Sequence, residues 1–257
     1  LNQVDAADAA LTITGTNVTK SITYTGGAGS DIVVGGTVGD NLSGGAGVDS
    51  LTGTAGNNTI AGGDGIDTLV IGSGIDNVDG GAGNDIITGG STLNAVDTID
   101  GGDGTDTLTV SAAVAYSTIL GGVSNVEVLK PIGAIAITLQ TPITGMSTIN
   151  LSDTGNAVVT FATGYTGAMT VSLAGDSNNN TDKVVNTAGV ALSVTGYGLD
   201  FDADTTITGG AGTDTITMTN TADFSSVLTA VTGVETITVL DYTLNADANI
   251  TTGAANL

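Results

Sequence analysis

A nine-residue repeat is the feature of the sequence that most constrains its fold. Nine consecutive units run from Gly26 to Thr109, and five of them fit the pattern Gly-Gly-x-Gly-x-Asp-x-(aliphatic)-x without a departure. The five intact units begin at Gly26, Gly44, Gly62, Gly80 and Gly101. A tandem repeat of this period and composition predicts a parallel β-roll that binds calcium.

Each position of the unit has a physical role. The glycines allow positive φ angles, and so a tight turn that brings several backbone carbonyls round a common point. The aspartate at the sixth position adds a carboxylate, and calcium takes about six to eight oxygen ligands. Positions seven to nine are expected to form a short strand whose eighth residue points inward. The inward residues are Val33, Leu42, Leu51, Ile60, Leu69, Val78, Ile87, Ile99 and Leu108.

One coil of such a roll needs two units, so turns on the same side recur every second unit. The intact units are the odd-numbered ones, which predicts one complete edge with up to four calcium sites between successive turns. Its aspartates are Asp31, Asp49, Asp67, Asp85 and Asp106. The first and third residues of each turn are expected to add oxygens: Gly26, Ala28, Gly44, Ala46, Gly62, Asp64, Gly80, Ala82, Gly101 and Asp103.

The even-numbered units depart from the pattern. Val38 and Ile71 replace glycines, Asn58 replaces an aspartate, and the eighth unit has three extra residues within 91–95. We therefore expect a weaker second edge with Asp40, Asp76 and Asp97 as partial ligands. The alternative is a set of glycine-rich turns between solvated carboxylates. The register that all nine units keep argues against it.

Composition excludes several classes of function. The 257-residue chain has no cysteine, histidine or tryptophan, only three basic residues, and a net charge of −23. Neither disulfides nor zinc–thiolate sites are possible, and no histidine- or cysteine-based catalysis is available, so we expect no enzyme. Such an acidic chain has no cationic surface for nucleic acid. No apolar run approaches the ~20 residues of a membrane span. The start at Leu1 shows no signal peptide, and we expect a fragment or a processed piece of a longer protein.

A longer repeat lies over the nonapeptides. The segment that begins at Gly101 matches the segment that begins at Gly209, and the match extends to Val126-Glu127 and Val234-Glu235. The second copy adds Asp214 to the candidate calcium ligands. The two glutamates could bind calcium or contact a lattice neighbour, but a simpler role is favoured, either as a charge at a strand edge or as a hydrogen-bond acceptor for a turn.

Period-two alternation dominates residues 131–208 and predicts half-buried strands that either continue the solenoid or form a sandwich. Asp200, Asp202 and Asp204 alternate there, and three carboxylates on one face of a strand repel one another unless a cation lies between them. Metal binding at these three residues stays open. The polar loop 176–182 could also bind calcium, although an ordinary turn is favoured.

Little helix is expected, with short candidates only at 4–10, 111–120 and 223–230. We divide the chain into lead-in strands (1–25), the β-roll (26–109), a Thr/Ala/Gly-rich strand region (110–208) and a second partial module (209–257).

The nonapeptides resemble the RTX repeats of bacterial secreted proteins. That resemblance implies a calcium-dependent β-roll that leaves the cell by type I secretion. The Val-Glu segments 122–129 and 233–238, with the Thr/Ala/Gly-rich strands and scarce lysine, resemble RTX-type surface-layer proteins. This second resemblance implies a structural protein of the extracellular cell surface that self-assembles into an S-layer lattice. The implied partners are lattice neighbours and a cell-surface polysaccharide or lipopolysaccharide.

A different function stays open, namely an RTX adhesin segment that serves as a spacer or a ligand-binding arm. Strands such as 215–219, with alternate threonines, would then form a binding face. A regular one-sided threonine array over many coils would favour this alternative, and the sequence does not show one.

Overall fold

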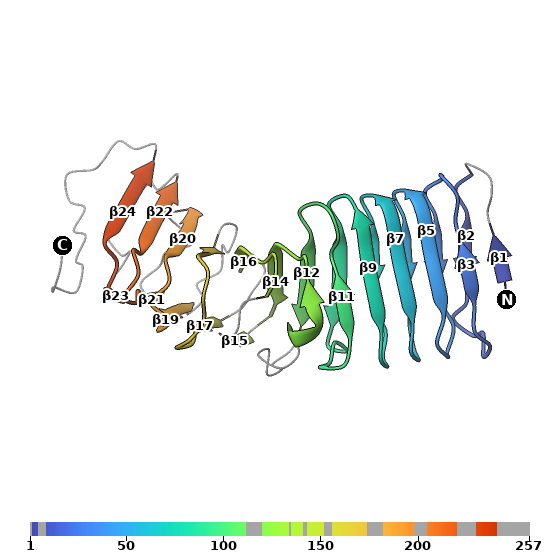
Figure 1. Ribbon diagram of the computed structural model, residues 1–257, viewed down its shortest axis with the longest axis horizontal. Helices are drawn as coiled ribbons and strands as arrows, with labels where there is room; N and C mark the ends of the chain where they lie inside the picture. The colour runs from blue at the N-terminus through green and yellow to red at the C-terminus, as the bar shows by residue number, and fades with distance from the viewer. Residues whose placement is uncertain are drawn as a thin grey trace. The chain divides into compact units, whose positions relative to one another are not determined.

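The computed structural model is an all-parallel β-solenoid of about nine turns (Figure 1). It describes residues 2–4, 9–111, 120–133, 135–140, 143–151, 156–173, 182–197, 205–219 and 230–240. Successive strands alternate between sheets, and neighbouring strands within a sheet are two places apart along the chain. The predicted fold class is confirmed.

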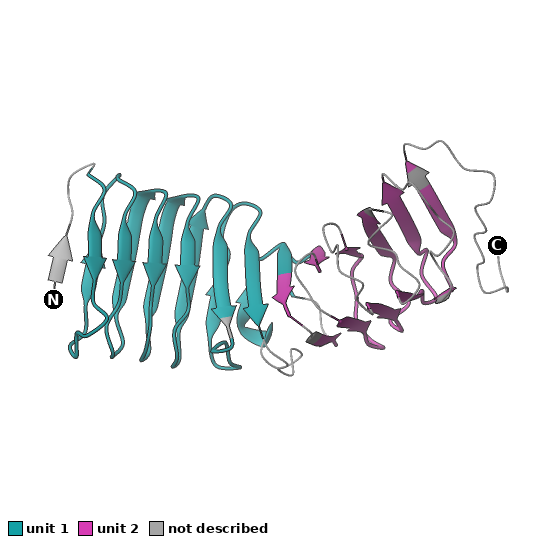
Figure 2. Cartoon of the chain, turned by 180° about the vertical axis from the view of Figure 1, so that it is seen from behind, with its two compact units in different colours: residues 1–111, 118–129, 143–146 teal, residues 112–117, 130–142, 147–257 magenta. Residues whose placement is uncertain are grey.

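The chain forms two compact units (Figure 2). The first comprises residues 1–111, 118–129 and 143–146, and the second comprises residues 112–117, 130–142 and 147–257. The division of the chain into four segments remains a prediction.

The first unit contains the nonapeptides. One sheet has the order β1 (Asn2–Val4), β3 (Thr23–Thr25), β5 (Asn41–Gly47), β7 (Thr59–Gly65), β9 (Asn77–Ala82), β11 (Thr98–Asp100) and β13 (Val123–Ser124). The facing sheet contains β2 (Thr12–Thr14), β4 (Ile32–Val34), β6 (Ser50–Thr52), β8 (Thr68–Val70), β10 (Ile86–Gly90), β12 (Thr107–Ser111) and the start of β14 (Val128–Ile132). A short 3-10 helix, η1 (Leu120–Gly122), precedes β13.

The strands begin where the repeat predicts, at the seventh position of each unit. Their eighth residues are buried and form two facing rows. One row is Leu42, Ile60, Val78 and Ile99, preceded by Tyr24 from before the first unit, and the other is Val33, Leu51, Leu69, Ile87 and Leu108. Strands β5, β7 and β9 are longer than predicted because they continue into the following turns, where the glycines also pair in register.

The second unit repeats the two-sheet arrangement. One sheet contains β15 (Ile135–Leu139), β17 (Ala157–Phe161), β19 (Lys183–Asn186), β21 (Thr206–Thr208) and β23 (Ala230–Thr232). The other contains β16 (Thr148–Asn150), β18 (Met169–Ser172), β20 (Leu192–Tyr197), β22 (Thr215–Thr219) and β24 (Thr236–Leu240). Of the two architectures that period-two alternation allowed, this region is therefore a solenoid and not a sandwich.

Strands β16 to β24 carry two columns of polar side chains on their outer face. Register places these residues directly beside one another, although the sequence intervals between them are unequal. The columns are Thr148, Thr170, Ser193, Thr215 and Thr236, and Asn150, Ser172, Thr195, Thr217 and Thr238. From the sequence we expected no regular one-sided threonine array. The structure corrects this expectation, because strand register aligns mainly threonine residues in these columns.

In the described part of the chain, no helical segment has the length and apolar character that a membrane span requires. The three short helix candidates fall largely outside the described residues.

Candidate metal-binding turns

The aspartates of the odd-numbered units form a stack, here called the odd-edge ladder. It comprises Asp31, Asp49, Asp67, Asp85 and Asp106, all of them buried. In each step, the backbone N–H of one aspartate donates to Oδ1 of the aspartate one coil later. The four N···O distances from Asp31 to Asp106 are 2.7, 2.8, 2.8 and 2.7 Å. One carboxylate oxygen of each residue thus holds adjacent coils together.

The second carboxylate oxygen of most members has no hydrogen-bond partner. This holds for the buried Oδ2 atoms of Asp49, Asp67, Asp85 and Asp106. Burial raises the pKa of these four carboxyl groups, because it disfavours the charged form. For Asp67 and Asp106 the pKa reaches about 6, with neighbouring carboxylates as a further cause. A charged group buried in this way needs a positive partner.

Carbonyl oxygens of the next coil approach these unpaired atoms. A Cβ atom added at Gly62 would lie less than 3.0 Å from both Asp67 Oδ2 and the carbonyl oxygen of Gly80. A Cβ atom added at Gly44 or Gly80 would likewise lie close to the carboxylate oxygen of its own turn and to a glycine carbonyl of the next coil. At Gly101 the carbonyl oxygen belongs to Asn125. Only a residue without a Cβ leaves this space open. A carboxylate and carbonyl oxygens are the hard ligands that calcium prefers, so the turns fit that ion.

The glycines at the second and fourth positions give these turns their shape. They have positive φ angles in all four turns: Gly45, Gly47, Gly63, Gly65, Gly81, Gly83, Gly102 and Gly104. The third residues stack between them, with Ala46 beside Asp64, Asp64 beside Ala82 and Ala82 beside Asp103. The carbonyl of Asp103, a predicted ligand, accepts a hydrogen bond of 2.8 Å from the Gly83 N–H.

The even edge forms a second stack of Asp40, Asn58, Asp76 and Asp97, with N···Oδ1 distances of 3.0, 2.8 and 2.9 Å. Here the chain itself supplies donors to the second oxygen. Gly36 N–H donates to Asp40 Oδ2 at 2.6 Å, and Asn94 N–H donates to Asp97 Oδ2 at 2.8 Å. Among these carboxylates, only Asp76 Oδ2 is buried without a partner, and burial raises the pKa of Asp76. This edge therefore offers fewer free oxygens.

The two glutamates of the longer repeat have the same hydrogen-bond role. Glu127 Oε2 accepts from the Asp106 N–H at 2.8 Å, and Glu235 Oε2 accepts from the Asp214 N–H at 2.6 Å. Each glutamate thus takes the place of the next aspartate in a ladder, in agreement with the interpretation favoured from the sequence. The second carboxylate oxygen of Asp214 already has a partner in the chain, because Oδ2 accepts a hydrogen bond of 2.7 Å from the Gly210 N–H. We call a turn closed when a donor of the chain satisfies this second oxygen, and open when none does.

Sequence reasoning missed two residues. Asn125 supplies the carbonyl that faces Asp106 Oδ2. Its counterpart in the second copy is Gly233, whose carbonyl lies near Asp214 Oδ2 beside Gly209. The offset between the two copies was the signal that could have found them. Asp182 is also buried, and its Oδ1 accepts from the Ala157 N–H at 2.9 Å.

Other predicted positions cannot be placed. Asp200, Asp202 and Asp204 lie outside the described residues, as does the loop 176–182 except for Asp182. Within the described ranges, no group of three or more acidic side chains gathers round a common point. The odd-edge turns instead combine one carboxylate with backbone carbonyls.

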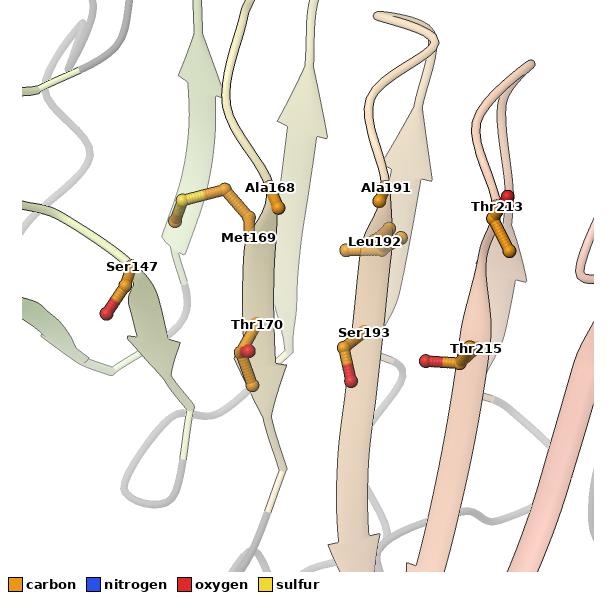
Figure 3. Close-up of a pocket in the computed structure, with 9 residues that line it drawn as sticks. All are labelled: Ser147, Ala168, Met169, Thr170, Ala191, Leu192, Ser193, Thr213 and Thr215. Atoms are coloured by element: carbon orange, nitrogen blue, oxygen red, sulfur yellow. The ribbon is translucent and has the colours of Figure 1, made fainter.

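A shallow hollow of about 410 Å³ lies on the second unit (Figure 3). Thr170, Ser193 and Thr215 from adjacent strands present a row of hydroxyl groups in it. Its nine lining residues carry no charged side chain: Ser147, Ala168, Met169, Thr170, Ala191, Leu192, Ser193, Thr213 and Thr215.

Residues 25–37, 34–69, 70–92, 94–112 and 201–217 match a family model described as the RTX calcium-binding nonapeptide repeat (4 copies). The chain carries RTX repeats. RTX nonapeptide repeats bind calcium, and the several copies here make this a calcium-binding protein of a kind that is secreted. The match includes the turn of Asp214 in the second unit. Neither the curated proteins nor the solved structures provide a match to the chain.

Proposed function

We propose that the RTX turns at Asp49, Asp67, Asp85 and Asp106 bind calcium, and that the chain is a calcium-dependent structural segment of a bacterial cell surface. In this proposal it assembles into an S-layer-type lattice after type I secretion. The observation that carries the calcium assignment is the row of four buried Oδ2 atoms, each without a partner and each near a carbonyl of the next coil.

These carboxylates link calcium to folding. In the folded chain they lie stacked and desolvated, and the whole chain has a net charge of −23, so repulsion opposes folding when calcium is scarce. The ligand set exists only when adjacent coils are in register, so binding free energy becomes folding free energy. Extracellular calcium modules have affinities on the order of 10⁻⁴ to 10⁻³ M. The coils that bind calcium would therefore be unstable before export and become stably folded outside the cell.

Exposed aliphatic side chains support contacts between copies of the chain. Val48 and Ile66 occupy the fifth position of successive odd-edge turns and are 59% and 54% exposed. Ile75 and Val96 occupy the same position on the even edge, at 53% and 58%. Neighbouring exposed apolar residues are typical of interaction sites. We assign them to lattice contacts, with a cell-surface polysaccharide or lipopolysaccharide as the anchoring partner.

A second candidate, an adhesin spacer or ligand-binding segment, draws on the outer columns of β16 to β24. Their hydroxyl and amide groups repeat at the spacing of neighbouring parallel strands. Such a face suits a ligand with regularly repeated polar groups, and the hollow of Figure 3 lies on it. We assign no catalytic role to either unit.

Electron microscopy of the chain in about millimolar calcium and in EGTA tests the assembly. Ordered sheets that dissolve in EGTA are expected. Val48→Ser with Ile66→Ser should abolish the sheets without changing calcium binding. Thr105→Ser, at the same position of another odd-edge turn, is the control. Monodisperse rods in calcium would contradict the lattice and favour the adhesin segment.

A further inference from the structure

The first odd-edge turn differs from the four that follow it. Asp31 is buried like the others, and its Oδ1 accepts a hydrogen bond of 2.8 Å from the Leu11 N–H. Its Oδ2, however, accepts a hydrogen bond of 2.7 Å from the hydroxyl group of Tyr24. The corresponding Oδ2 atoms of Asp49, Asp67, Asp85 and Asp106 have no partner. A side-chain donor thus lies where the other turns leave an oxygen free.

The difference arises from one position of the buried row in the first sheet. Tyr24 pairs in register with Leu42, and the row continues through Ile60 and Val78 to Ile99. Each member stands seven residues before the aspartate of the next odd turn, as Tyr24 stands before Asp31 and Leu42 before Asp49. Leucine, isoleucine and valine have no hydrogen-bond donor. Only the tyrosine carries an O–H group that reaches the turn.

The oxygens of the first turn otherwise resemble those of the later turns. A Cβ added at Gly26 would lie 2.6 Å from Asp31 Oδ2 and closer still to the carbonyl oxygen of Gly44. The carboxylate and the carbonyl of the next coil therefore approach each other here as well. Two features separate this turn from the four others: the tyrosine hydroxyl, and the backbone of Gly27 and Gly29, which lack the positive φ of the corresponding glycines there.

We propose that Tyr24 replaces a calcium ion in the first turn. Its O–H donates to Asp31 Oδ2 and stabilises the buried carboxylate, because hydrogen bonds to ionised acceptors are the strong ones. The turn of Asp31 then closes without metal, and calcium binding starts at Asp49. The first coil is a calcium-independent end on which the calcium-dependent coils stack. This inference rests on the proposed function, since it requires the later turns to bind calcium.

In three other turns a backbone N–H of the chain also satisfies the second carboxylate oxygen, and one of them is that of Asp97, with the Asn94 N–H as donor. Asp40 and Asp214 receive their second hydrogen bond from the backbone N–H groups of Gly36 and Gly210. Those two glycines lack the positive φ that the second glycine has in the four open turns. A donor from the chain thus satisfies the second carboxylate oxygen in each of these four turns.

The substitution Tyr24→Phe tests the proposal, because it removes the donor and keeps the buried ring. Calorimetric titration with calcium chloride should show one more bound ion per chain than the unchanged protein. Hydrogen exchange in EGTA should show faster exchange at the Leu11 and Asp31 N–H groups, with protection restored by calcium. The reciprocal variant Leu42→Tyr, which places a hydroxyl before Asp49, should bind one ion fewer.

Tyr165→Phe is the matched control, because Tyr165 is also buried but lies in the second unit. It should leave the calcium count and the exchange of Leu11 unchanged. An unchanged count in Tyr24→Phe, with calcium binding intact in the parent chain, would overturn this inference alone. No calcium binding in the parent chain would instead overturn the assignment of the four open turns.

Discussion

The backbone N–H of Asp49 donates a hydrogen bond of 2.8 Å to Oδ1 of Asp67, one coil later in the solenoid. The same contact recurs along the odd-edge ladder, so the two oxygens of each carboxylate have different roles. One oxygen joins neighbouring coils, and the other remains free for a cation. An aspartate suits this role because its short side chain keeps both oxygens close to the backbone of the turn.

Asp67 and Asp40 should differ in their contribution to calcium binding. Asp67 Oδ2 has no partner, whereas Asp40 Oδ2 already accepts from the Gly36 N–H. We expect Asp67→Ala to weaken calcium binding more than Asp40→Ala does, and Asp67→Asn to weaken it at least about tenfold, or ~1.4 kcal/mol. Calcium titration followed by circular dichroism measures both. Equal effects at the two positions would contradict a one-sided set of sites.

Gly62 should tolerate no side chain. Its Cβ would enter the space between Asp67 Oδ2 and the Gly80 carbonyl, so Gly62→Ala should reduce both calcium affinity and the calcium-dependent gain in thermal stability. Gly121→Ala is the matched control, since an added Cβ there meets nothing within 4 Å. Thermal denaturation with and without calcium distinguishes them. A Gly62→Ala protein with normal calcium stabilisation would place the ion elsewhere.

Acid should stabilise the calcium-free fold. The pKa of Asp67 and Asp106 is about 6 in the folded chain, above its ordinary value. The folded state therefore binds more protons than the unfolded state between about pH 4 and 6, and its stability falls as pH rises through this window. In EGTA, urea denaturation should show a more stable fold at about pH 5 than at about pH 7.5.

Protons and calcium compete for the same oxygens. The calcium concentration at half-saturation should therefore rise as the pH falls below about 6. A midpoint that stays constant from about pH 7.5 down to pH 5 would show that the buried Oδ2 atoms are not ligands.

Glu127 should stabilise the end of the ladder through its hydrogen bond to the Asp106 N–H. Glu127→Ala leaves that N–H without an acceptor and should lower the free energy of unfolding by about 1–3 kcal/mol. Glu127→Gln keeps an amide oxygen that can accept, and should lose less. Urea denaturation of calcium-saturated protein makes the comparison. Equal losses in the two variants would show that the charge, and not the acceptor, is what matters.

The regular part of the structure could be predicted because every feature repeats at a constant interval. Strands start at the seventh position, and residues such as Leu51 and Ile60 point inward, because a strand alternates its side chains between two faces. The second unit was less predictable. Register places Thr170 beside Ser193 and Thr215 beside Thr236 across coils of different length, so periodicity along the chain does not reveal the columns.

The order of residues was enough to establish a two-unit coil, an inward aliphatic row and an aspartate in each odd-edge turn, because these follow from turn and strand geometry within a single repeat. Which carboxylate oxygens stay free was decided only by the folded chain. The donors that close Asp31, Asp40 and Asp97 are Tyr24, Gly36 and Asn94, at three different distances along the chain. Whether such a donor reaches its carboxylate depends on the path of each turn and on packing between sheets, which no local pattern encodes.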